Sequence, residues 1–138
     1  MATIKDAAQI EDVMFDAIAD RLRKSINGDV YFPDQRPADS NLMDAVIVVS
    51  FVDAKQIQEG RAKVNIFIPD IDNNTGRKVQ DREKVNLLRG LDKELVSLLN
   101  EADTSYDWSL SQGSFLGKAP TMAEHYWNIS LQFKVTTF

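Results

Sequence analysis

His125 is the only histidine of the chain, and histidine is the side chain best suited to proton transfer near neutral pH. Glu124 stands next to it, just before a predicted strand. A catalytic histidine of this kind works with an activated nucleophile, but the sequence has no Gly-x-Ser-x-Gly elbow, and Gly113–Ser114 is only a glycine-rich turn. We therefore expect no catalytic residue and no enzymatic activity.

The segment from Asp70 to Gly76 resembles the start of a calcium-binding loop, because oxygen ligands occupy its first, third and fifth positions. Asp81 stands at the twelfth position, where such a loop has a longer, bidentate Glu. The sixth position needs Gly for a sharp turn and is Thr75 here, and a strand rather than a helix precedes the segment. Asn, Asp and Gly are also ordinary turn residues. We expect a plain connection, with no metal and no cofactor.

Composition disfavours other kinds of binding site. The formal net charge is −5, whereas binding to nucleic acid needs clustered Lys and Arg, so we expect none. The glycine motifs that cradle phosphates are absent. The small basic groups at 21–24 and 77–78 lie among acids, which is typical of a solvated surface. Because the chain has no cysteine, it has no disulfide, thiolate metal site or cysteine nucleophile.

The length of 138 residues predicts one domain, 1–138, and a hydrophobic content of 43% is enough for a core. Met1 to Ile10 lacks the apolar stretch of a signal peptide. The longest apolar run, Ala45 to Val49, is too short to span a membrane. We expect a cytoplasmic protein without membrane contact.

Two stretches have apolar residues at the three- and four-residue spacing of amphipathic helices. The first runs from about Asp6 to Ile26, with Thr3 and Asp6 as a capping pair and a left-handed stop at Asn27–Gly28. The second runs from about Arg82 to Glu101, and Gly90 inside it indicates a close approach to another element. The two apolar stripes are Ile10, Val13, Met14, Ala17, Ile18, Leu22 and Ile26, and Val85, Leu88, Leu91, Leu95, Leu98 and Leu99.

Alternating and β-branched runs predict the strands, which are Val30–Phe32, Ala45–Val52, Ala62–Ile68, Tyr106–Leu110 and Trp127–Val135. Ala45–Val52 is apolar on both faces, which favours a place inside the sheet. The predicted connections are an irregular one at 33–41, a polar loop at 69–80 and a long mobile loop at 111–124.

The resulting order is α-β-β-β-α-β-β, which predicts an α+β two-layer sandwich with two helices on one face of a mainly antiparallel sheet. The opposite, outer face of this sheet would carry Lys63, Asn65, Phe67, Asn128, Ser130, Gln132 and Lys134.

Several features combine into one layout that covers nearly the whole chain. They are the chain length, the leading helix ending at Asn27–Gly28, the phrase Val30–Pro37, the hairpin Ala45–Ile68, the helix after Asp81 and the aromatic-rich last strand around Tyr126–Trp127. The layout resembles that of the tail-terminator and tail-completion proteins, minor tail or neck proteins of long-tailed bacteriophages and related prophages.

The resemblance implies a phage or prophage structural protein that forms a ring, commonly of six subunits, at the end of the tail tube. Such a ring stops growth of the tube and joins the tail to the head. The implied partners are other copies of this chain, the tail-tube protein and head-completion proteins. The implied location is the cytoplasm during assembly and the tail of the virion afterwards.

Two other classes of function stay open. A small α+β ligand-binding or regulatory domain would use a pocket between helix and sheet, and would be a monomer or dimer. An enzyme would need a polar cluster that sequence spacing does not reveal. Size-exclusion chromatography with light scattering separates the ring from the ligand-binding domain.

Overall fold

The computed structural model describes residues 5–53, 58–102, 105–119 and 123–135, which form three helices and eight strands. The helices are α1 (Ala7–Arg23), α2 (Arg82–Leu87) and α3 (Leu91–Ala102). The strands are β1 (Val30–Tyr31), β2 (Ala45–Val52), β3 (Glu59–Pro69), β4 (Ile71–Asp72), β5 (Lys78–Val79), β6 (Tyr106–Leu110), β7 (Phe115–Lys118) and β8 (Glu124–Val135).

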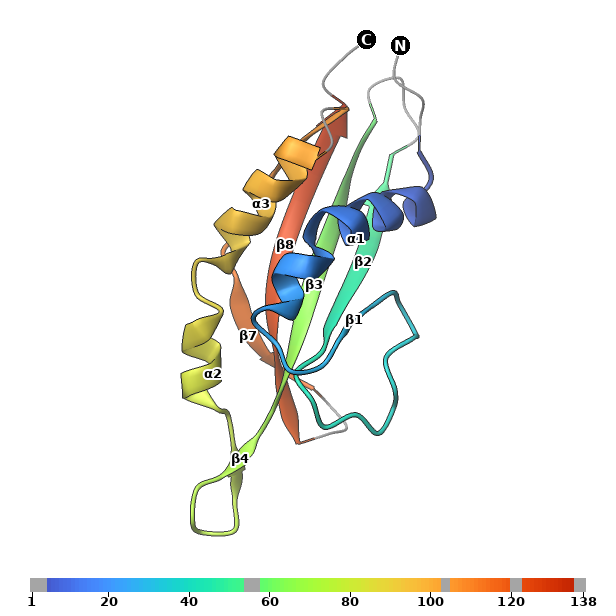
Figure 1. The fold of residues 1–138 in the computed structure, drawn as a ribbon. Helices are drawn as coiled ribbons and strands as arrows, with labels where there is room; N and C mark the ends of the chain where they lie inside the picture. Colours follow the sequence, from blue (N-terminus) through green and yellow to red (C-terminus); the bar gives the residue numbers. More distant parts are fainter. Residues whose placement is uncertain (1–4, 54–57, 103–104, 120–122, 136–138) are drawn as a thin grey trace.

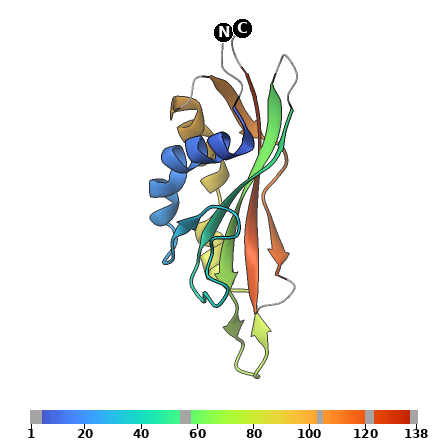
Figure 2. The same ribbon diagram turned by 90° about the vertical axis from the view of Figure 1, so that its right-hand side faces the viewer.

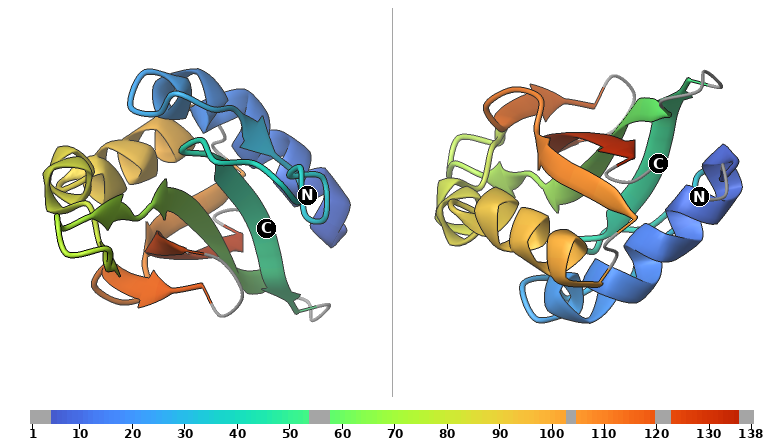
Figure 3. Two further views of the ribbon diagram at one scale, coloured as in Figure 1. Left: turned by 90° about the horizontal axis from the view of Figure 1, so that it is seen from below. Right: turned by 90° about the horizontal axis from the view of Figure 1, so that it is seen from above.

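The main sheet has the strand order β1-β2-β3-β8-β6, and β7 also pairs with β8, beyond the end of β6 (Figure 1). All pairs are antiparallel except β1 with β2. The helices form a second layer on one face of this sheet, as Figures 2 and 3 show from the side and from both ends. The predicted α+β class, with helices packed against a mainly antiparallel sheet, is confirmed.

The core lies between the two layers and follows from the strand and helix periodicities. In β3 and β8 alternate side chains face the helices and are buried, namely Ala62, Val64, Ile66, Ile68, Ile129, Leu131 and Phe133. The helices contribute Ile10, Met14, Ile18, Leu22, Val85, Leu88, Leu91, Leu95 and Leu99. The predicted stripes are thus confirmed at these positions, whereas Val13, Ala17, Ile26 and Leu98 are only partly buried.

The first helix is shorter than predicted. Asp6 is its N-cap and forms a capping box with Gln9, while Thr3 lies outside the described residues. The helix ends at Arg23, and Gly28 lies beyond it without a positive φ. A Cβ on Gly28 would overlap Asp44 Oδ1 and the Met43 carbonyl oxygen. The predicted left-handed stop is therefore wrong: glycine is needed here because another segment passes too close for any side chain.

The second predicted helix is broken in two at Gly90, which has a φ of 80°. Nothing lies within 4 Å of the place where its Cβ would be, so the predicted close approach is wrong. The left-handed backbone of Gly90 separates α2 from α3, and Val85, Leu88 and Leu91 still reach the core on both sides of the break.

Two predicted connections and one strand position differ in the structure. The predicted loop at 69–80 contains the end of β3 and the hairpin β4–β5, and residues 71–79, called the arm below, project beyond the main sheet (Figures 1 and 2). The predicted loop at 111–124 contains β7 and the first residue of β8. Only the first residues of β2 lie between two strands, because β1 pairs with Ala45 and Val46 alone. In each case the paired strand is too short to produce a recognisable alternation of apolar and polar residues in the sequence.

Substituting Leu22 or Leu95 by Asp is expected to abolish folding, because each would place an unpaired carboxylate in the core at a cost of about 4 kcal/mol or more. Thermal melts followed by circular dichroism measure this. The matched control is Leu87→Asp, since the Leu87 side chain is 71% exposed. A Leu22→Asp variant that melts within a degree or two of the parent would contradict the assigned helix face.

Candidate functional site

Arg36 lies between two buried carboxylates on the outer face of the sheet. Its Nη1 and Nη2 donate to Glu124 Oε1 and Oε2 at 2.9 and 3.0 Å, and its Nε donates to Asp44 Oδ2 at 2.9 Å. The three side chains are 12%, 5% and 1% exposed for Arg36, Glu124 and Asp44. Such buried and bidentate geometry makes this Arg36 cluster a fixed structural unit rather than a pair of exchanging surface charges.

The Arg36 cluster joins three strands at one end of the sheet. Asp44 immediately precedes β2, and Glu124 is the first residue of β8. Phe67 of β3 lies between them, with its ring centroid 4.2 Å from the guanidinium carbon of Arg36. The Phe67 amide also donates to the Asp44 carbonyl oxygen at 2.7 Å. Arg36 itself comes from the connection between β1 and β2, so this connection is held against the outer face.

Asp44 also accepts hydrogen bonds from residues other than Arg36. Its Oδ1 accepts from the Asp29 amide at 3.0 Å, and its Oδ2 accepts from Ser40 Oγ at 2.5 Å. Asn27 Oδ1 accepts from the Met43 amide at 2.8 Å, and Gly28 leaves room for this approach. Both oxygens of the Asp44 carboxylate are therefore saturated, as a charge taken out of water requires.

The electrostatics of the cluster do not favour proton transfer. Burial by itself lowers the pKa of Arg36, but the hydrogen bonds to Glu124 and Asp44 and their negative charges outweigh it and raise the pKa above its usual value. Near the protein surface, the hydrogen bond from Arg23 and that from the Val30 amide lower the pKa of Asp29. Neither group is an acid or base poised near neutrality, and both arrangements serve to hold segments together.

His125 binds Asp70 rather than its sequence neighbour Glu124. Its Nδ1 lies 2.6 Å from Asp70 Oδ1, and the Asp70 carboxylate is almost fully buried. The Asp70 amide donates to the Ala123 carbonyl oxygen at 2.9 Å. Within the part of the chain that the structure describes, no hydroxyl group hydrogen bonds to the histidine ring. The pair ties the base of the arm to the start of β8.

Asp70, the first residue of the calcium-like segment, is bound to His125, and the oxygens that follow accept local hydrogen bonds. Asp72 Oδ1 accepts from the amides of Asn74 and Gly76 at 2.9 and 3.2 Å, which closes the turn of the arm. Asp81 caps α2 by accepting from the Lys84 amide. Across the described ranges, no group of three or more acidic or histidine side chains gathers as a metal site would require. The segment is a hairpin turn followed by a helix cap.

A row of aromatic rings continues from the Arg36 cluster across the outer face. Phe67 and Tyr126 have ring centroids 6.1 Å apart, and Tyr126 and Phe115 have centroids 6.5 Å apart. Gly117 lies under the Tyr126 ring, where any Cβ would overlap it. Phe115, at the far end of the row, is 42% exposed. The row links Arg36 to the strand at the margin of the sheet, β7.

The predicted outer-face residues all lie on this face, since they alternate with the buried residues of β3 and β8. Asn128 Nδ2 donates to Asn65 Oδ1 at 2.7 Å, and Ser130 Oγ donates to Asn128 Oδ1 at 2.5 Å. The bond to Asn65 across the strands and the bond from Ser130 within β8 together satisfy Asn128, although it is nearly buried.

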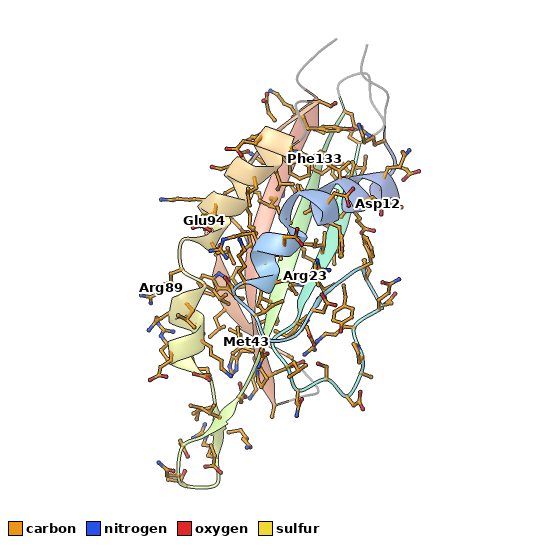
Figure 4. The ribbon with its side chains drawn as sticks, viewed as in Figure 1. Asp12, Arg23, Met43, Arg89, Glu94 and Phe133 are labelled. Atoms are coloured by element: carbon orange, nitrogen blue, oxygen red, sulfur yellow. The ribbon has the colours of Figure 1, made fainter. Side chains whose placement is uncertain are left out.

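A hollow of about 550 Å³ lies on the outer face, toward the opposite end of the sheet from the Arg36 cluster. In Figure 4, Phe133 marks the end of the sheet with the hollow, and Met43, the residue before Asp44, marks the end with the Arg36 cluster. The hollow is lined by Phe51, Glu59, Gly60, Arg61, Asp107, Ser109, Gln132, Phe133 and Lys134. A Cβ on Gly60 would overlap the Phe51 carbonyl oxygen and the Phe133 ring, so glycine is required at its floor.

Sequence reasoning missed the Arg36 cluster, because its partners lie 8 and 88 residues away. A usable signal was present: an arginine between two prolines, together with an acid immediately before or at the start of each of two strands. Gly113 and Ser114 lie in the irregular segment before β7, and Ser114 Oγ donates to Asp92 Oδ2 at 2.9 Å, which connects this segment to α3.

Comparisons with family models and with curated proteins gave no match to this chain. Among the described residues, no helix combines the length and the apolar character needed to cross a membrane.

Replacing Arg36 by Gln is expected to lower the free energy of unfolding by about 3–5 kcal/mol, because Asp44 and Glu124 would stay buried without a counter-charge. For a chain of this size the melting temperature should fall by roughly 10 °C or more. Arg23→Gln is the control, since it removes two solvent-exposed ion pairs, with Asp20 and Asp29, and should cost far less. An equal fall of the melting temperature in the two variants would show that the buried cluster stabilises the fold no more than exposed ion pairs do.

A cation that binds only the native state must raise the melting temperature. Because we expect no calcium to bind at residues 70–76, millimolar calcium should leave the melting temperature unchanged. Differential scanning calorimetry with calcium or with a chelator measures this. An upward shift of several degrees that disappears in Asp70→Asn would reverse our interpretation of residues 70–76.

Proposed function

We propose that this chain is a non-catalytic assembly protein, and specifically a tail-terminator or tail-completion protein of a phage or prophage. In this proposal copies of the chain form a ring that caps the tail tube and contacts head-completion proteins. The observation that carries it is the outer face of the main sheet: in the described parts of the chain no helix covers this face, although it presents aromatic side chains.

The Arg36 cluster and the His125–Asp70 pair are engaged in structural contacts, which supports a role without catalysis. Arg36, Asp44 and Glu124 satisfy one another, and His125 is bound to Asp70. A catalytic site would leave at least one such group directed at a substrate cavity. The hollow near Phe133 contains none of these groups, and its charged lining residues are Glu59, Arg61, Asp107 and Lys134.

The distribution of exposed apolar side chains supports assembly. Phe115 and Phe51 are 42% and 53% exposed at two ends of the outer face, and Ile71 is 45% exposed on the arm. Aromatic side chains are enriched at the centres of protein interfaces, because they lose water at a small cost in conformational entropy. A projecting arm and a broad sheet face are different surfaces, as a head-to-tail ring contact requires.

The second candidate is a small-ligand-binding or regulatory domain, and the hollow of about 550 Å³ favours it. The hollow lies on the outer face, not between helix and sheet as the sequence suggested for this class. A thermal-shift screen of metabolites tests the candidate: a ligand whose stabilisation is lost in Gln132→Ala, a change of an exposed lining side chain, would support it. The ring proposal instead expects a mass well above that of a dimer by light scattering at high protein concentration.

The decisive test of the ring proposal uses the polymerising tail-tube protein from the same genome. When the chain is added, tubes are expected to stop growing and to carry a ring at one end in electron micrographs, because a terminator binds only the finished tip. Tubes that keep growing with no ring would remove the terminator function.

A matched pair of variants locates the surface in the same assay. Phe115→Ser should weaken capping, since it removes an exposed aromatic of the outer face. Leu87→Ser removes a still more exposed apolar side chain from α2 and should leave capping unchanged. The reverse result would move the assembly surface to the helix layer.

A further inference from the structure

Two unpaired strand edges of the main sheet, called margins below, are capped by side chains from the helices. At β6, Asn100 of α3 accepts from the Trp108 amide at 2.8 Å and donates to the Trp108 carbonyl oxygen at 3.0 Å. At β2, Glu11 of α1 accepts from the Val49 amide at 3.0 Å, next to an irregularity in the strand pairing. Unpaired strand margins attract other strands, and such caps prevent it.

The margin of β7 has no such cap in the described ranges. The strand pairs with β8 on one side, and the Ala119 amide donates to the Glu124 carbonyl oxygen there. Because backbone direction alternates along a strand, Leu116 and Lys118 direct their amide and carbonyl groups away from β8. Beside this open margin stand the exposed Phe115 ring and the exposed Lys118 side chain. In the isolated subunit water satisfies these groups, and an added extended backbone segment can replace it along the whole row.

The arm is a segment that lacks a partner of this kind. Its strands β4 and β5 have two residues each and pair only with one another in the described structure. An isolated two-stranded hairpin is marginally stable in water and gains from a third strand. Both residues of β4 are exposed; Ile71 is apolar and Asp72 is acidic.

We propose that the arm of one copy adds to the open margin of β7 in a second copy, with β4 beside β7. The charges match, because Asp72 would face Lys118 while Ile71 packs near Phe115. The other strand of the arm carries Lys78, which has the same charge as Lys118, so β5 is the unfavourable side. The recognised partner is therefore a second copy of this chain.

This inference rests on the proposed ring and specifies its contact. The arm and the β7 margin are different surfaces of one subunit, so their pairing is head-to-tail, and repetition about an axis closes a ring.

Photo-cross-linking tests the contact directly. An unlabelled protein with p-benzoylphenylalanine in place of Phe115 is mixed at high concentration with the nitrogen-15-labelled parent and illuminated. The labelled tryptic peptide that ends at Arg77 and contains β4 should be cross-linked several-fold more than with the same probe in place of Phe51, the somewhat more exposed aromatic elsewhere on the outer face. No excess over the Phe51 probe would overturn the proposal.

Charge variants separate a specific contact from chance encounters. Lys118→Glu in the probe protein should reduce the cross-link to the Phe51 level, because it faces Asp72 with a like charge. Asp72→Asn in the labelled protein keeps the oxygen that accepts from Asn74 and Gly76, so the turn is retained while the charge is lost, and cross-linking should fall several-fold. A cross-link insensitive to both changes would also overturn the proposal.

The two proposals can fail independently. Tubes capped by a ring without the arm cross-link would retain the terminator function and remove this contact. A charge-dependent cross-link without capping would retain the contact and remove the terminator function.

Discussion

The ion pairs of Arg36 are the constraint on which one end of this fold depends. A guanidinium and two carboxylates are taken out of water together, so each needs the others to remain charged and bound. Their geometry fixes the starts of β2 and β8 relative to each other and lays the connection after β1 over Phe67. Gly28 follows from the same constraint, because Asp44 occupies the space that a side chain would need.

This constraint also organises the outer face. The Phe67 ring under Arg36 is the first of a row that continues through Tyr126 to Phe115 at β7. On the other side of β8, the bond between His125 and Asp70 fixes the base of the arm. The aromatic row and the arm are thus held at one end of the sheet by two separate polar contacts. In the proposed ring, these rigid features would be the surfaces offered to neighbours.

Local periodicity was sufficient to predict the layers, because Leu22 or Leu95 on a helix and Val64 or Ile129 on a strand are buried by repeating patterns. It failed where the cause was a contact with a distant residue. Gly28 was predicted to be a left-handed helix stop and Gly90 to mark a close approach, and the structure reverses the two: Gly28 makes room for Asp44, and Gly90 bends the backbone into the left-handed region. Nothing local indicated which was which. The same reason hid Glu124, 88 residues from Arg36.

The central claim is that assembly uses the outer face, the β7 margin and the arm, while the helix layer stays in solvent. Hydrogen–deuterium exchange of the free protein and of the protein bound to tail tubes measures this most directly, since backbone amides report the segments that become covered. We predict slower exchange on binding at 71–79 and at Phe115–Lys118, with α1 and α3 unchanged. Protection confined to α1 and α3 would contradict the account.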